Sequence, residues 1–378
     1  MPNDIHKPAF QVDNPDAFQK MLGNFRRISQ LAVDTESNSL FAYTEQVCLI
    51  QFSTGKADYL VDPLAEIDIS GLKTIFANPK IEKIFHAAEY DILCLKRDYG
   101  FEFSNLFDTM QAARILGIEK LGLANMLADL FGIEHPKGLQ KADWAKRPLT
   151  PEMCAYGRMD THYLKQLRDT LAGQLAEKQL VDLAHEDFIR LCQVEPNHKN
   201  NTLYTQVSGY HKLEPQVLRI LDELCLYRDD LARKMDRPHF KVMGNSVLLS
   251  VAQAQPNTIQ LLKEVDDISP KVVERFGEGL VGAIKRGLNL SPIVLEKRMR
   301  PVQEYVDRLQ ALQDWRKEAA GKMKVQSDII LPRDVLEQIA ATRPRNSAEL
   351  EALMQSIPWR FSQYGREILK AIAKGKLS

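Results

Sequence analysis

The chain has 378 residues, of which 44% are hydrophobic and 26% charged, and its formal net charge is zero. This length predicts two or three domains, and the composition is that of a globular protein able to bury a core. No apolar run approaches the roughly 18 residues that a membrane span needs, and the first residues do not resemble a signal peptide. We therefore expect a cytoplasmic protein without a membrane partner.

The first half of the chain has the pattern of a mixed α/β domain. Short apolar runs bounded by turn residues predict strands over 28–33, 47–53 and 57–61. Apolar residues at helical spacing predict helices over 70–77, 87–97, 108–117, 121–131, 150–172 and 174–192. Asp108 begins one of these helices and is interpreted as its cap rather than as a ligand. We place this α/β domain at residues 1–195.

The second half of the chain predicts two small all-helical domains. A polar stretch at 194–209 indicates a linker, which we place at residues 196–212. Beyond it the sequence repeats at a constant offset of 88 residues, which pairs Leu224 with Leu312 and Gly277 with Gly365. Because the offset never changes and is too long for a solenoid unit, we expect two domains with separate cores, at residues 213–292 and 297–378.

The zero net charge conceals an asymmetry between the two halves. Residues 1–200 contain 22 Lys and Arg against 28 Asp and Glu, whereas residues 201–378 contain 28 against 22. A basic half suggests a polyanionic partner such as nucleic acid, although an ordinary solvated surface explains the charge equally well. The basic side chains considered for such a surface are Arg233, Lys234, Arg237, Lys241, Lys285 and Arg286.

The five cysteines show no metal-binding or redox spacing. They are Cys48, Cys94, Cys154, Cys192 and Cys225, and most of them lie in apolar segments. An odd number of widely spaced cysteines indicates reduced core thiols, as in a cytosolic protein.

Two carboxylates follow the first predicted strand, in the sequence LAVDTES. Asp34 and Glu36 are two residues apart, so in an extended strand their side chains point to the same face. Like charges this close are unfavourable unless a positive charge lies between them. A divalent cation with a preference for oxygen ligands, Mg²⁺ or Mn²⁺, would serve, although a D-x-E pattern alone is a weak signal.

Further acids occur on two predicted helices. Asp91 lies near the start of an amphipathic helix that His86 precedes. Tyr156 and Asp160 are four residues apart on a later helix, and this spacing places both on one face among apolar neighbours. An Asp beside an apolar face is costly to bury unless it is paired or bound to a metal.

Taken in order, these four acids and one tyrosine resemble the DEDD superfamily of 3′–5′ exonucleases, in its tyrosine-bearing branch. The segments FHAAEYD, FDTMQAARIL, ADWAKRPLT and YGRMDTHYL are similar to the ribonuclease D family over about residues 20–195. The repeated helical domains resemble the helicase-and-RNase-D C-terminal (HRDC) domain. The resemblance implies a ribonuclease H-like α/β domain, with a mixed sheet flanked by helices, followed by two HRDC domains.

The same resemblance implies a metal-dependent hydrolase. Asp34, Glu36, Asp91 and Asp160 would hold two divalent ions, which clamp the attacking and leaving oxygens of the phosphodiester, and Tyr156 would orient the attacking water. The expected partner is RNA with an accessible 3′ end, with tRNA precursors foremost, and 5′-mononucleotides are the expected product. No obligate protein partner is implied.

Weaker candidates for substrate contacts surround this set. Basic residues that flank an aromatic side chain in HPKGLQKADWAKRP could hold a single-stranded 3′ end, although a loop with a packed Trp and solvated lysines explains them nearly as well. The candidates for substrate contacts are Thr35, Gln51, His86, Lys141, Trp144 and Arg147.

Two other functions are compatible with the sequence. The acids do not distinguish RNA from DNA, so a DNA 3′–5′ exonuclease of the proofreading or helicase-associated type is an alternative, against which the repeated helical domains argue. A catalytically silent RNA-binding scaffold is the other, but all four acids and the tyrosine are present.

Overall fold

The computed structural model describes residues 8–136, 138–196, 202–296 and 300–374. These residues divide into two compact units, each described here by itself. The first contains the N-terminal residues to 37, residues 47–196 and the residues from 300 on, and the second contains residues 38–46 and the residues between 197 and 299. In the described part of the chain, no helix is long and apolar enough to cross a membrane.

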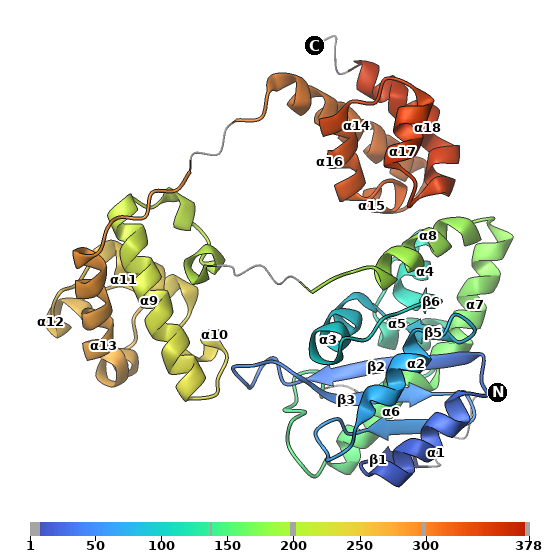
Figure 1. The fold of residues 1–378 in the computed structure, drawn as a ribbon, viewed down its shortest axis with the longest axis horizontal. Helices are drawn as coiled ribbons and strands as arrows, with labels where there is room; N and C mark the ends of the chain where they lie inside the picture. The colour runs from blue at the N-terminus through green and yellow to red at the C-terminus, as the bar shows by residue number, and fades with distance from the viewer. Residues whose placement is uncertain (1–7, 137, 197–201, 297–299, 375–378) are drawn as a thin grey trace. The chain divides into compact units, whose positions relative to one another are not determined.

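A six-stranded mixed sheet forms the centre of the first unit (Figure 1). Its spatial order is β1-β4-β3-β2-β5-β6, in which β3 pairs antiparallel with β2 and β4 and the other neighbours are parallel. This confirms the predicted mixed sheet. The strands are β1 (Phe10–Val12), β2 (Gln30–Ser37), β3 (Val47–Ser53), β4 (Asp58–Val61), β5 (Glu82–Phe85) and β6 (Leu106–Asp108).

Strand β2 extends further than the sequence predicts. It continues through Asp34, Thr35 and Glu36 to Ser37, because β3 pairs with it along this stretch and a register shift appears only between Glu36 and Ser37. The two carboxylates therefore lie within a paired strand and not in a loop after it. Strands β1, β5 and β6 were not predicted, since they have only three or four residues each.

Eight α-helices surround the sheet in this part of the described chain. They are α1 (Pro15–Phe25), α2 (Leu72–Phe76), α3 (Glu89–Tyr99), α4 (Thr109–Leu116), α5 (Leu123–Phe131), α6 (Pro151–His162), α7 (Leu164–Glu177) and α8 (Val181–Cys192), with a 3₁₀ turn, η1, at Ile69–Gly71. Helix α6 packs on β2, β3 and β4, while α7 packs on β2 and β5. The side chain of Asp108 caps α4 by accepting from Gln111 N at 2.8 Å, which confirms its predicted role.

The two long helices predicted over 150–172 and 174–192 are three helices in the structure. Helix α6 ends at His162 and α7 starts at Leu164, and Tyr163, with a ψ of −1°, is the cap between them. Between α7 and α8 the chain turns through Gln179, which has a positive φ of 58°. The first break allows α6 to follow the central strands and α7 to turn toward β5.

The second unit contains the first helical domain. Its helices are α9 (Pro215–Lys234), α10 (His239–Val242), α11 (Asn245–Ala254), α12 (Ile259–Leu262) and α13 (Pro270–Asn289). Two 3₁₀ turns, η2 (Leu203–Gln206) and η3 (Tyr210–Lys212), precede them within the segment that we predicted as a linker. Tyr204 and Val207 from this segment are buried in the core of the domain. The described part of the segment is therefore packed on the domain and leads directly into α9.

The second helical domain repeats the first at the predicted offset. Its helices are α14 (Gln303–Met323), α15 (Ser327–Ile330), α16 (Arg333–Thr342), α17 (Ser347–Leu353) and α18 (Pro358–Lys374), and each begins 88 residues after its counterpart. Buried contacts repeat as well: Arg228 donates to Met243 O, and Arg316 donates to Leu331 O, both at 3.0 Å. The predicted tandem repeat is therefore confirmed at the level of single hydrogen bonds.

The second helical domain packs against α8 of the first unit through a buried cation. Arg360, at the start of α18, is 0% exposed. Its guanidinium contacts Glu186 Oε2 and Asp187 Oδ1 of α8, each at 2.8 Å, and donates to Ile329 O of its own domain. Trp359 packs against the core of the α/β domain beside it.

Candidate active site

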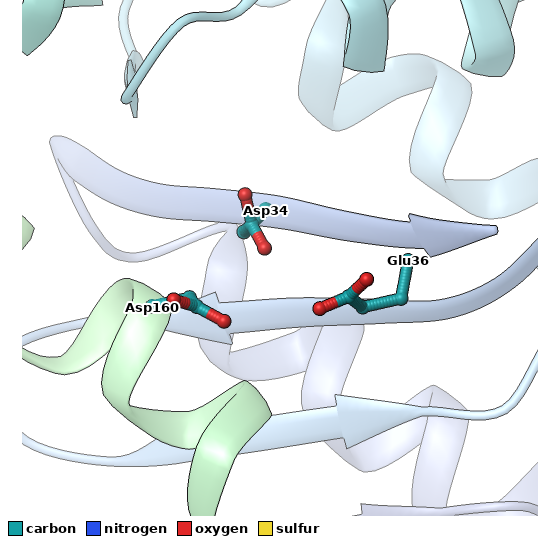
Figure 2. Close-up of side chains that lie close together, drawn as sticks. All are labelled: Asp34, Glu36 and Asp160. Atoms are coloured by element: carbon teal, nitrogen blue, oxygen red, sulfur yellow. The ribbon is translucent and has the colours of Figure 1, made fainter. Parts of the chain in front are cut away.

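Three carboxylates converge on one face of the sheet (Figure 2). Asp34 and Glu36 come from β2, and Asp160 comes from α6 and lies beside them. One oxygen from each of the three acids lies within 4.8 Å of the others. Alternation along β2 and the packing of α6 across β2 and β3 bring together residues that are more than 120 positions apart.

The electrostatics of this cluster favour a positive charge bound between the acids. Burial, followed by repulsion from Asp160 and Asp91, raises the pKa of Glu36 to about 9. Burial and the neighbouring acids also raise the pKa of Asp34 well above its usual range. Buried oxygen ligands that repel one another are the donor set that Mg²⁺ and Mn²⁺ prefer, so these residues fit a divalent cation.

Asp91 lies beside the cluster but outside the group of three. It occupies the first turn of α3, and its Oδ1 accepts a hydrogen bond from the hydroxyl of Thr35. Burial raises the pKa of Asp91 to about 7, although the hydrogen bond from Thr35 opposes this shift. Its charge acts on both Asp34 and Glu36, which shows that it is close to them. Thr35, a candidate substrate contact, uses its hydroxyl to hold this acid.

Tyr156 faces the same cluster from α6, one turn before Asp160. Its side chain is buried, and burial followed by repulsion from Asp160, Glu36 and Asp34 raises its pKa. The hydroxyl therefore keeps its proton at neutral pH and can donate a hydrogen bond. Gln140 forms a hydrogen bond with it from the loop between α5 and α6.

The loop between α5 and α6, residues 133–150, adds a side chain that the sequence did not reveal. His135 Nε2 lies 2.9 Å from Asp160 Oδ1, and its ring lies edge-on to Tyr156 with the centroids 5.3 Å apart. Burial lowers the pKa of His135, but the hydrogen bond to Asp160, the charge of that acid and the Pro136 carbonyl together outweigh this, so the pKa is raised. No local pattern marks this residue, because the contact depends on the path of an irregular loop.

Two predicted substrate contacts in this loop are structural instead, which corrects the prediction. Trp144 is only 1% exposed and packs among Leu49, Leu60 and Met153, so its ring is not available to stack on a base. Arg147 donates to both carboxylate oxygens of Asp62 and to the carbonyls of Trp144, Lys146 and Cys48. These bonds saturate its guanidinium and fix the loop to the sheet.

The remaining candidates differ in their surroundings. Lys141 is exposed, whereas Lys137 lies outside the described residues. His86 Nδ1 contacts Thr109 Oγ1 at 2.9 Å and is not in the cluster of three acids. Gln51 lies opposite Asp34 in the sheet, is fully buried, and neither atom of its amide has a described hydrogen-bond partner. An unsatisfied buried amide beside the acids is a polar group ready for a ligand.

Three of the six basic residues considered in the first helical domain are paired with acids of the same domain. Arg233 contacts Asp229, Lys234 contacts Asp230, and Arg286 contacts Glu223, with distances of 2.7–2.9 Å. Arg237 and Lys285 are exposed. The positive charge available to a polyanion on these helices is therefore smaller than the count of basic residues suggests.

Comparison with family models identifies the parts of the chain. Residues 10–176 match the model described as 3′–5′ exonuclease, and residues 217–284 and 306–372 match the HRDC domain. The chain therefore has a 3′–5′ exonuclease domain followed by two HRDC domains.

The chain is also similar to individual proteins and solved structures. The chain is 27% identical to ribonuclease D of Pseudomonas paraeruginosa, over 97% of this chain and 99% of that protein. It is 31% identical to Protein RRP6-like 2 of Arabidopsis thaliana, over 76% of this chain and 37% of that protein. The crystal structure of the catalytic core of RRP6 from Trypanosoma brucei is 28% identical, with a TM-score of 0.65 over 75% of this chain and 81% of that one.

Over nearly its whole length the chain is therefore similar to a ribonuclease D, as the resemblance of its motifs predicted. The first four curated relatives are longer proteins, of which this chain spans between 30% and 51%.

Proposed function

We propose that this protein is a metal-dependent 3′–5′ exoribonuclease that releases 5′-mononucleotides. The observation that carries the proposal is the convergence of Asp34, Glu36 and Asp160 within 4.8 Å, on a domain of the 3′–5′ exonuclease family. Without a cation, burial of three acids at this separation would be strongly unfavourable.

Each side chain has a distinct part in this reaction. Asp34, Glu36 and Asp160, with Asp91 beside them, would hold two divalent ions, Mg²⁺ or Mn²⁺. Bound there, such ions supply Lewis-acid stabilisation of the attacking and leaving oxygens. Tyr156, protonated and held by Gln140, orients the attacking water by a hydrogen bond. The unsatisfied amide of Gln51 is placed to hydrogen-bond substrate or water in the same space.

The substrate we propose is RNA with an accessible 3′ end, with precursors of tRNA foremost. The two HRDC domains and the near full-length similarity to ribonuclease D of P. paraeruginosa support RNA over DNA. A cytoplasmic location is in keeping with the five cysteines, none of which forms a disulfide.

The test uses 3′-labelled RNA and a DNA of the same sequence, each incubated with the protein in Mg²⁺, Mn²⁺ or EDTA. We expect mononucleotide release from RNA in either metal and none in EDTA. Asp34→Asn and Asp160→Asn should abolish release, while Tyr156→Phe should slow it by about 100-fold and leave metal binding intact.

Asp143→Asn serves as the matched control, because this acid lies in the loop near the site but outside the cluster. Equal degradation of DNA would contradict the RNA assignment, and wild-type release by Asp34→Asn would contradict the site.

A further inference from the structure

His135 is held in the site by contacts on both sides of its ring. Nε2 lies 2.9 Å from Asp160 Oδ1, and Nδ1 lies 2.9 Å from Pro136 O. The side chain is 5% exposed, and the ring meets Tyr156 at 86°. Since the carboxylate can only accept a hydrogen bond, Nε2 donates to it. An imidazole fixed at both nitrogens restricts the carboxylate it contacts.

The loop that carries His135 is itself anchored on the sheet. Trp144 is buried against Leu49 and Leu60, with Leu139 packed beside it, and Arg147 joins the loop to Asp62 and Cys48. A histidine on a freely moving loop could not position another residue. Here the part of the loop that follows His135 is packed on the sheet, which restricts where the histidine can lie.

We propose that His135 is a positioning residue of the metal centre, which orients Asp160 so that this carboxylate can bind the divalent cation. The inference rests on the proposed metal-dependent function and assigns a residue to it that is neither an acid nor the tyrosine. The hydrogen bond to Oδ1 leaves Oδ2 free of this contact and fixes the torsion of the carboxylate. Outer hydrogen-bond partners of ligating groups typically contribute 10- to 100-fold in metal affinity or activity.

Two variants of equal size separate the hydrogen bond from the space that the side chain fills. His135→Gln keeps a donor at the end of the side chain, and His135→Met removes it. His185→Met is the matched control, because His185 is exposed on α8. Mn²⁺ binding to the full-length, EDTA-stripped protein is measured by isothermal titration calorimetry, and the fold is checked by thermal unfolding in circular dichroism.

We expect His135→Met to weaken Mn²⁺ binding by about 10-fold or more, and His135→Gln to bind within about 3-fold of the wild type. His185→Met should bind like the wild type. In turnover assays, the loss in His135→Met should be partly recovered by raising the Mn²⁺ concentration, which a loss of substrate contact would not allow.

Wild-type Mn²⁺ affinity in His135→Met would overturn the inference. So would equal loss in both variants with unchanged melting curves, since the donor would then be irrelevant. If His135→Met fails to fold, the Mn²⁺ affinity of His135→Gln is the deciding measurement. A loss of more than 10-fold in that affinity overturns the inference. A wild type that binds no Mn²⁺ overturns it too, whereas Mn²⁺ binding without nucleotide release would overturn the proposed exonuclease function alone.

Discussion

At the scale of single residues, the acids of the site lower the stability of the folded, metal-free protein. Removal from water, followed by repulsion from the neighbouring acids, raises the pKa of the half-buried Glu36 to about 9. The folded, metal-free protein therefore carries an electrostatic cost that the unfolded chain does not. Such cost at a functional site is expected where groups are arranged for a ligand that is not yet bound.

Replacing one of these acids should stabilise the metal-free protein. We expect Glu36→Gln to raise the free energy of unfolding in EDTA by roughly 1 kcal/mol or more at pH 8, because Glu36 must take up a proton on folding at this pH whereas Gln is already neutral. Urea unfolding curves in EDTA measure this change. Glu119→Gln, an acid outside the cluster, is the control, and lower stability of Glu36→Gln would contradict the account.

The raised pKa values also fix the sign of the pH dependence. An acid whose pKa is higher in the folded state stabilises the fold below its unfolded pKa, and this contribution is lost as the pH rises through the folded pKa. For Glu36 that window runs from about 4.5 to about 9. In EDTA, the urea concentration at the unfolding midpoint should therefore decrease as the pH is raised from 5 to 9. Mn²⁺ should reverse the fall, because it binds the ionised acids.

At the scale of elements, the sequence identified the regular parts of the site and not the irregular one. Alternation in β2 placed Asp34 and Glu36 on one face, and helical spacing placed Tyr156 and Asp160 together, as the structure has them. The loop over 133–150 has no such period. Its aromatic and basic residues suggested RNA contacts, yet Trp144 is buried because the loop folds back on the sheet.

The anchoring of this loop should matter for activity although Arg147 contacts no acid of the cluster. Arg147→Ala removes the bonds to Asp62, Cys48 and Trp144 that fix the loop. We expect a stability loss of about 1–3 kcal/mol and lower turnover, because His135 and Gln140 would no longer be held. The neighbouring exposed Lys146→Ala should change neither in urea unfolding and nuclease assays.

At the scale of the whole molecule, the two HRDC domains share one fold but have different surfaces. The offset of 88 residues matches Trp359 with Lys271 and Arg360 with Val272. The residues that join the second domain to α8 therefore have no counterparts in the first. The repeat could be predicted from the sequence because similar residues recur at a constant offset. The docking on α8 could not, since it depends on a contact between Arg360 and Glu186, which are 174 positions apart in the chain.

Breaking this docking contact should be costly. Arg360→Met leaves Glu186 and Asp187 of α8 buried without their cation, and removing one partner of a buried pair costs about 3–5 kcal/mol. Tryptophan fluorescence during urea unfolding reports on it, because Trp359 packs at the contact. Arg333→Met, which removes an exposed pair with Glu337, should shift the midpoint little; equal shifts in both would contradict the assignment.

The constant offset of 88 residues between the two helical domains determines what an in-frame deletion between them would produce. An in-frame deletion of 88 residues, cut at any point in the first copy and its counterpart in the second, would splice matching helices into a single hybrid domain. A cut within α9 and α14, for example, would retain the Arg316 bond to Leu331 O, and with it α18 and Arg360. Recombination between the copies would thus yield a nuclease with one HRDC domain in a single step, already carrying the surface that docks on α8.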